Sequence, residues 1–276
     1  MSPFGYSLMW KPQNAGLVDG SQLRADRLCG LTLSDVRGTR LPVGNRSVPV
    51  GELFEVTPNE RQPARLVVEG SPRIERLAAG MESGLVEVHG DTGALLALGL
   101  RGGTVRVRGH AGGLAGAAMA GGTLIVEGDA GDRLGGPPPG TARGMAGGEI
   151  VVLGRSGAET GLGMRRGLIA VADGVGASPG YAALAGTIVV ARGGAEYAGA
   201  SMRRATVLFL DALAPRSLAP GFVLAARQNL TVVRLLLRRL ELHGFPIPAG
   251  APDSEYEIWN GPELDGARGE LLYRTV

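Results

Sequence analysis

Three histidines are the side chains of this 276-residue sequence best suited to acid–base chemistry near neutral pH. His89 falls on an outward position of a predicted strand, His110 directly follows a glycine in a predicted turn, and His243 ends a predicted helix, where a cation favours the helix dipole. None is joined in sequence to a nucleophile or a set of carboxylates that would form a recognisable active site. We expect all three at the surface, and His110 is the first candidate if the chain carries a catalytic site.

Other reactive side chains give a similar result. Several carboxylates lie in or beside predicted turns, where aspartate commonly bonds local backbone. They are Asp91, Asp129, Asp132, Glu159 and Asp173. The single cysteine, Cys29, excludes an internal disulfide and a cysteine-cluster metal site, and we expect it to be a small buried residue. The sequence therefore predicts no catalytic residue and no metal ligand.

A 19-residue repeat organises most of the chain and positions these residues. Strand-like segments recur every 19 residues, except for one interval of 26 between Thr123 and Glu149. They begin at Leu85, Thr104, Thr123, Glu149, Leu168, Thr187 and Thr206, with a weaker copy at Leu66. The longer interval indicates a seven-residue insertion, most economically placed in GGPPPGT at 135–141.

Glycines and methionines keep the same register. A G-x2-G-x3-G pattern follows three strands, at Gly109, Gly112, Gly116, Gly128, Gly131, Gly135, Gly154, Gly157 and Gly161. Glycine permits positive φ and close backbone approach, so we assign these residues to corners. GLGMRRG at 161–167 is then a corner and not a phosphate-binding loop, whose strand–helix context is absent. Methionine recurs at one repeat position, which predicts an internal ladder. Its members are Met81, Met119, Met145, Met164 and Met202, and Leu100 and Ala183 occupy the same position in the other two repeats.

The repeat determines the predicted fold. Each unit has a β-branched strand and a glycine-rich turn but no room for a crossover helix, which excludes a βαβ unit. Short β-rich units at a fixed period are typical of a β-helix. We predict an all-β chain, a right-handed single-stranded β-helix of about eight 19-residue coils over 63–211. An N-terminal β extension over 1–62, with strands at LTLSDV (31–36) and VGELFEV (50–56), and a helix and tail over 212–276 would cap it.

Strand alternation predicts which side chains fill the coil. The inward set is Val86, Val88, Val105, Val107, Leu124, Val126, Ile150, Val152, Ile169, Val171, Ile188, Val190, Val207 and Phe209. The outward positions of the early strands are Glu87, His89, Arg106 and Arg108, which predict a face in water. Those of the later strands are apolar and predict a covered face: Val151, Leu153, Ala170, Ala172, Val189, Ala191, Leu208 and Leu210.

A predicted helix over 226–243 is the candidate cover. One apolar stripe comprises Leu230, Val233, Leu236, Leu237 and Leu240. Val232, Leu235 and Leu242 widen it beyond an ordinary amphipathic face. The second side packs either on another chain or in a deeper groove of this one.

Arginine supplies nearly all the positive charge, because Lys11 is the single lysine. Arg101, Arg165 and Arg203 share one repeat position, and Arg166 and Arg204 share the next. Strands ~4.8 Å apart would align them along one corner. This row is either a solvated edge or a strip that binds a carboxylate-rich ligand or an acidic partner.

The net charge of +2 and the absence of a signal-like or long apolar segment predict a cytoplasmic protein with no nucleic-acid and no membrane partner.

The repeat resembles the glycine-rich β-helix shared by the C-terminal domain of glutamate synthase large subunits and the C subunit of formylmethanofuran dehydrogenase. The second resemblance is closer and spans nearly the whole chain. Its segments are LPVGN at 41–45, VGELFEV at 50–56, GMRRGLIAV at 163–171, GGAEYAGASMRRATV at 193–207 and GARGELL at 266–272. The arginine- and alanine-rich, lysine-poor composition favours the bacterial branch, the C subunit of the formyltransferase/hydrolase complex of methylotrophs.

This resemblance implies a complex that converts formyl-tetrahydromethanopterin to formate through formylmethanofuran or a methanofuran-like carrier. It implies that the C subunit is a non-catalytic scaffold without a cofactor, and that formyltransferase and zinc-dependent amidohydrolase-like centres belong to partner subunits. The carriers bear glutamate-rich tails, so the arginine row would hold such an anionic arm or contact a sister subunit. Three alternatives remain: the C subunit of an archaeal dehydrogenase, a glutamate-synthase-type structural domain, which the terminal segments disfavour, and a stand-alone acyltransferase using His110, whose usual 18-residue coils do not match.

Overall fold

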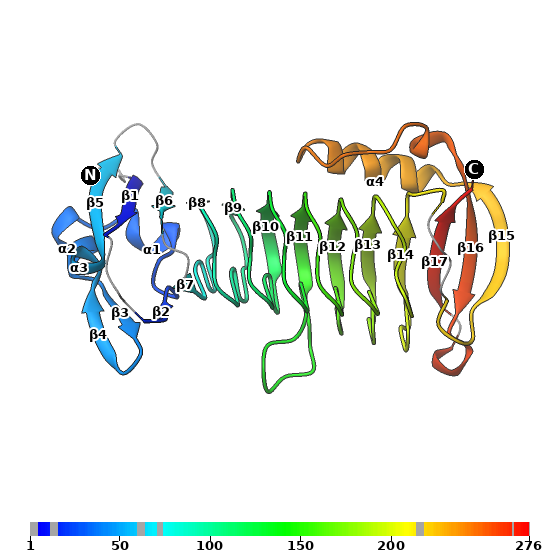
Figure 1. The fold of residues 1–276 in the computed structure, drawn as a ribbon, viewed down its shortest axis with the longest axis horizontal. Helices are drawn as coiled ribbons and strands as arrows, with labels where there is room; N and C mark the ends of the chain where they lie inside the picture. The colour runs from blue at the N-terminus through cyan, green and yellow to red at the C-terminus, as the bar shows by residue number, and fades with distance from the viewer. Residues whose placement is uncertain are drawn as a thin grey trace.

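The computed structural model of the protein describes residues 5–11, 16–59, 64–70, 74–213, 218–266 and 268–275. The predicted boundary between residues 62 and 63 lies outside these residues. Regularly spaced strands follow one another along the long axis, with small N-terminal elements at one end and a helix and strand group at the other (Figure 1). No helix in the described ranges is long and apolar enough to span a membrane.

The chain is mostly β, and its largest element is a 13-stranded sheet in the order β15-β16-β17-β14-β13-β12-β11-β10-β9-β8-β6-β1-β5. The strands of this sheet are β1 (Gly5–Trp10), β5 (Phe54–Asn59), β6 (Arg65–Glu69), β8 (Leu85–His89), β9 (Thr104–Val107), β10 (Ala120–Val126), β11 (Ala146–Val152), β12 (Arg166–Val171), β13 (Gly186–Val190), β14 (Ala205–Phe209), β15 (Val223–Asn229), β16 (Glu255–Gly261) and β17 (Gly269–Arg274). A second sheet has the order β4-β3-β2-β7. Its strands are β2 (Val18–Asp19), β3 (Arg40–Val43), β4 (Arg46–Pro49) and β7 (Ile74–Glu75).

From Leu85 onward, successive repeats pair in parallel through equivalent residues, which agrees with the predicted register. The weaker copy was predicted one residue too late, because Leu85 pairs with Arg65 and not with Leu66. The first residues of the predicted segments are Cα partners from strand to strand, from Leu85 with Thr104 through to Thr187 with Thr206. A second line of parallel bridges joins Thr92, Ala111, Ala130, Ser156 and Val175 one repeat after another. The repeats are therefore in contact along at least two lines.

The predicted inward side chains form the main core. All fourteen belong to one buried cluster and are at most 3% exposed. The five methionines of the predicted ladder are each 0% exposed in the same cluster. Both predictions are confirmed.

The nine repeat glycines divide into two kinds. The third glycine of each set has positive φ, at 65° for Gly116, 69° for Gly135 and 74° for Gly161. The other six approach the preceding repeat so closely that an added Cβ would lie 2.6 or 2.7 Å from one of its backbone atoms. Both conformational reasons for a corner glycine are thus present, at separate positions.

Helix α4 (Thr231–Glu241) covers the outer face of the later strands (Figure 1). Its buried side chains Val233, Leu237 and Leu240 join a second cluster with the outward apolar residues of strands β10 to β14. The predicted cover is confirmed, but its start at residue 226 is wrong. Residues 226–229 belong to β15, because β16 offers this segment an antiparallel partner.

Glu87 is another correction on this face. Predicted to lie in water, it is only 8% exposed, because neighbouring side chains surround it, including that of its ion-pair partner Arg65. Arg106 and His89 are half-buried, and Arg108 is exposed as expected.

The N-terminal elements include short helices, and the prediction of a strand at LTLSDV is wrong. The helices are α1 (Ala25–Leu28), α2 (Leu33–Gly38) and α3 (Val50–Leu53). Thr32 starts α2 by accepting the Asp35 backbone N–H on its hydroxyl at 3.3 Å, an N-cap contact that favours a helix. In VGELFEV, α3 precedes the predicted strand, which begins at Phe54.

The C-terminal tail closes the other end of the repeats. β17 pairs in parallel with β14, so Glu270 takes the place beside Thr206 that a further repeat would occupy. Short 3-10 helices flank β16 at Ala251–Asp253 and Glu263–Asp265. This pairing is compatible with the capping role predicted for the tail.

Candidate anion-binding site

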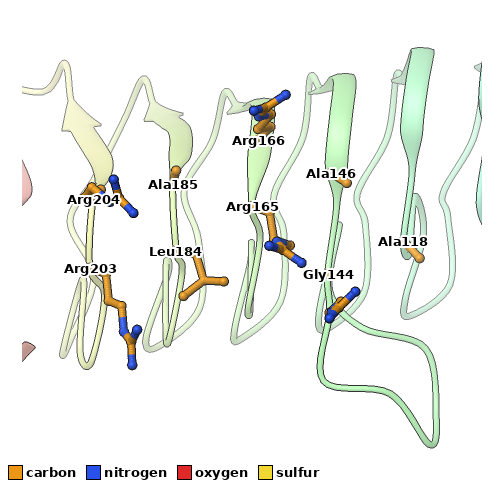
Figure 2. A pocket seen from close by; sticks show the side chains of 10 residues that line it. Ala118, Gly144, Ala146, Arg165, Arg166, Leu184, Ala185, Arg203 and Arg204 are labelled. Atoms are coloured by element: carbon orange, nitrogen blue, oxygen red, sulfur yellow. The ribbon is translucent and has the colours of Figure 1, made fainter.

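Five arginines surround a hollow of about 720 Å³ on the surface of the repeats (Figure 2). We call it the arginine hollow, and its cationic residues are Arg143, Arg165, Arg166, Arg203 and Arg204. Its remaining walls are small or apolar: Ala118, Gly144, Ala146, Leu184 and Ala185. The small side chains thus leave room for a ligand, and the guanidinium groups provide the polar surface of the hollow.

The repeat itself positions four of these arginines. Met164 and Met202 point into the core, and the two residues after each emerge at the surface. Backbone hydrogen bonds to the preceding repeat fix the emerging chain, from Arg165 N–H to Met145 O at 2.7 Å and from Arg203 N–H to Ala183 O at 2.8 Å. The two arginine pairs therefore lie two strand spacings apart, about 10 Å. The repeat between them supplies only Leu184 and Ala185 to the hollow.

The hollow concentrates positive charge, and the described residues do not compensate it. All five arginines are exposed. No ion pair between described residues involves any of them, and no carboxylate lines the hollow. Guanidinium groups remain charged at all physiological pH values and present planar donors suited to carboxylate or phosphate. The arrangement favours an anion with several negative charges.

A second hollow of about 370 Å³ adjoins the first. It shares Arg203 and Arg204 and adds Arg268 from the segment before β17. The basic surface thus continues from the repeats to the C-terminal elements.

The structure brings together four of the five arginines predicted to form a row. Arg101 lies apart and forms an ion pair with Glu82 at 3.0 Å, with both side chains largely exposed. Arg143 and Arg268 were missed because neither occupies the repeat position used to find the others. The signal for Arg143 was the insertion itself, because Arg143 lies in the additional residues between Gly135 and Met145.

The histidines are engaged in ordinary structural contacts. His110 Nδ1 accepts the backbone N–H of Asp129 at 2.9 Å, and the Asp91 carboxylate accepts the backbone N–H of His110 at 2.7 Å. His243 Nε2 lies 2.9 Å from Glu149, which fastens the chain after α4 to β11. His89 lies 3.5 Å from Glu69. The predicted surface position holds for His110, whereas His89 and His243 are half-buried.

The turn carboxylates bond a neighbouring repeat and not their own turn. Asp129 accepts the Arg155 N–H and Asp132 the Ala158 N–H, each at 2.8 Å. Glu159 and Asp173 form ion pairs with Arg133 and Arg192, both at 2.7 Å. Within the described residues, no group of three or more His, Cys, Asp and Glu side chains could hold a metal ion.

Comparison with known proteins gives related chains in two kinds of complex. No protein-family model matches the chain. The C subunit of molybdenum-containing formylmethanofuran dehydrogenase 1 is 31% identical over 93 residues in Methanothermobacter marburgensis and 32% identical over 94 in Methanothermobacter thermautotrophicus. Each match covers 33% of this chain and 23% of the relative, so the chain matches less than a quarter of the length of these curated relatives.

A solved structure gives a much more extensive match. A chain of the formyltransferase/hydrolase complex from Methylorubrum extorquens, crystallised with methylofuran, superposes with a TM-score of 0.87. The sequences are 32% identical, and the superposition covers 98% of this chain and 100% of that one. This agreement over nearly the whole of both chains shows that the protein belongs to the same family as this chain of the formyltransferase/hydrolase complex, to which the C subunits of formylmethanofuran dehydrogenase are related over part of their length.

Proposed function

We propose that the chain is a structural, non-catalytic subunit of a formyltransferase/hydrolase complex. The observation that carries this proposal is the full-length match to a chain of such a complex. The arrangement of chemistry-bearing side chains supports it, because the histidines and turn carboxylates contact backbone or form ion pairs, and none of them lines either arginine-rich hollow.

The proposed complex converts formyl-tetrahydromethanopterin to formate through a methanofuran-type carrier, in one-carbon metabolism. The methylofuran in the related complex supports such a carrier. In this proposal the formyltransferase centre and a zinc-dependent amidohydrolase-like centre belong to partner subunits, and this chain holds no cofactor of its own. We place the complex in the cytoplasm.

We further propose the detailed architecture predicted from the repeat. Residues 63–211 form a right-handed single-stranded β-helix of about eight coils, between an N-terminal cap over 1–62 and a C-terminal helix and tail over 212–276. The parallel 19-residue register and the glycine corners support the coil. The pairing of β17 with β14 supports the C-terminal cap.

The arginine hollow is the proposed binding site of this chain. Arg165, Arg166, Arg203 and Arg204 would hold the glutamate-rich tail of the carrier or an acidic segment of a sister subunit. Their shared hollow and lack of carboxylate partners among the described residues support the assignment. Arg101, engaged with Glu82, would act only at the far end of such a strip.

Affinity purification of the full chain from its native cells tests the assembly. The proposal expects a formyltransferase chain and an amidohydrolase-like chain to co-purify in fixed ratio, as identified by mass spectrometry. Recovery of the protein alone, or with molybdenum-containing dehydrogenase chains, contradicts it. The second result would support the dehydrogenase alternative, which the two curated relatives favour.

The double variant Arg165→Gln, Arg203→Gln tests the binding role. In the wild-type complex, the KM for carrier should rise with ionic strength, because salt screens guanidinium–carboxylate attraction. The variant should have a higher KM at low salt and a weaker salt dependence. Arg108→Gln, which removes an exposed charge outside both hollows, should behave as wild type. Identical salt profiles for all three proteins would refute carrier binding in the hollow.

A further inference from the structure

The seven-residue insertion in the repeat lies beside the arginine hollow. We call residues 136–144 the insertion loop; it connects Gly135 with Met145. In the following repeat, Leu162 and Gly163 alone connect the equivalent residues, Gly161 and Met164. Two residues therefore suffice to close a corner, and the additional residues are not needed for the stacking of the repeats. Inserted surface loops on a regular scaffold commonly carry function.

The insertion loop contributes directly to the hollow. Arg143 and Gly144, its last two residues, line the cavity. The side chain of Arg165 projects toward Gly144, at the base of the loop, whereas Arg166 projects away from it (Figure 2). The loop thus adds a cation from outside the repeat register to the cations that the repeat supplies.

The base of the loop is held firmly against the next repeat. Gly144 donates its N–H to Gly163 O at 3.1 Å, and Met145 donates to Gly135 O at 2.7 Å. A Cβ atom on Gly144 would lie 2.4 Å from Leu162 O, so only glycine fits at this crossing. The backbone of the preceding residue, Arg143, is consequently held at a fixed position on the protein surface.

The body of the loop is also stiff. Pro137, Pro138 and Pro139 restrict φ at three successive residues. Thr141 donates both its N–H and its hydroxyl to Pro138 O, at 3.1 and 3.0 Å. A loop restrained in this way loses little conformational entropy when a ligand binds. It is therefore suited to present Arg143 in a preorganised position.

We infer that the insertion loop is one wall of the anion site and that Arg143 selects ligands with several negative charges over small single anions. This inference rests on the proposed binding role of the arginine hollow. A fifth guanidinium on a separate, rigid support contacts a part of an extended polyanion that the repeat arginines do not reach. A small anion held by one arginine pair gains little from Arg143.

Isothermal titration calorimetry of the full chain at low ionic strength tests the inference. The probes are a synthetic peptide of six glutamates and inorganic phosphate. We expect Arg143→Gln to weaken peptide binding about tenfold, the loss of one charge-assisted contact, and to leave phosphate binding unchanged. A variant whose insertion loop is replaced by Leu-Gly, as in the next repeat, should lose at least as much. Arg108→Gln is the control for the change in net charge.

The possible results distinguish the role of Arg143 from the proposed anion-binding role of the hollow as a whole. Wild-type peptide affinity in Arg143→Gln, with weakened binding in Arg165→Gln, overturns the role of the loop and leaves the hollow intact. Wild-type affinity in both variants, or no peptide binding by the wild-type chain, refutes the hollow as an anion site. Equal loss for peptide and phosphate in Arg143→Gln overturns the selectivity. Because Arg143 is exposed, its variant should keep the wild-type melting temperature.

Discussion

Substitution of Gly131 by alanine should destabilise the protein through a collision between neighbouring repeats. An added Cβ would lie 2.7 Å from the Gly113 nitrogen, 2.9 Å from its Cα and 3.0 Å from the Gly112 carbonyl carbon. All three are backbone atoms of the preceding repeat, so no side chain can move away to relieve the contact. Parallel bridges from the nearby Ala111 to Thr92 and to Ala130 hold that repeat to both of its neighbours. Ordinary van der Waals separation requires the two repeats to part by roughly 0.7 Å at this corner.

The expected cost follows from this displacement. Forcing one additional carbon into a packed backbone contact costs about 1–3 kcal/mol. The reduced freedom of the unfolded chain offsets about 0.4–1 kcal/mol of it. A net loss of about 1–2 kcal/mol corresponds to a melting temperature lower by roughly 2–8 °C for a chain of this size.

Gly113→Ala provides the matched control. It adds the same methyl group one repeat earlier, but the nearest atom would lie 3.4 Å away, an ordinary contact. Thermal unfolding followed by circular dichroism at one scan rate should show Gly131→Ala below the wild type and Gly113→Ala about 1–4 °C above it, because only the effect on the unfolded chain remains. Equal melting temperatures for the two variants would refute the claim that close repeat stacking requires the glycine.

Leu237→Ala removes a fully buried side chain from the inner face of α4 and should lower the free energy of unfolding in urea by about 2–5 kcal/mol. Leu235→Ala, at a position of the same helix that is 60% exposed, should change it little. Equal effects of the two substitutions would contradict the docking of this helix face. Burial raises the pKa of the Cys29 thiol to about 11, so iodoacetamide at pH 8 should label the native protein far more slowly than the urea-unfolded chain. Burial also raises the pKa of the Tyr256 hydroxyl to about 12. Both groups ionise more readily in the unfolded chain, so the stability that they contribute is lost as pH rises, from about 9 to 11 for Cys29 and from about 10 to 12 for Tyr256. The urea midpoint should fall over this range.

The repeat made most of the fold predictable. Strand positions, inward side chains and the methionine ladder all depend on one period, so each copy supported the assignment of the others. The two ends lack this redundancy. LTLSDV has the composition of a strand, but the hydroxyl of Thr32 caps the N-terminus of a helix that begins at Leu33. Residues 226–229 continue a helical pattern but pair with β16, a partner that follows only after the whole of α4.

The candidate site was predictable only where it follows the register. Arg165, Arg166, Arg203 and Arg204 share repeat positions, and the structure gathers them. Arg101 shares them too, but the repeats between it and Arg165 carry alanine, at Ala120 and Ala146. Arg143 reaches the hollow from the insertion loop, whose path depends on backbone contacts that no periodic pattern encodes.

The central claim is that this chain supports a formyl-transferring complex without performing its chemistry. The most direct measurement is formate release from formyl-tetrahydromethanopterin by the purified complex, by the isolated chain, and by partner subunits produced without it. We expect activity in the complete complex, none in the isolated chain, and loss of assembly and activity when the chain is omitted. Formate release by the isolated chain, or full activity of an assembled complex that lacks it, would contradict the account.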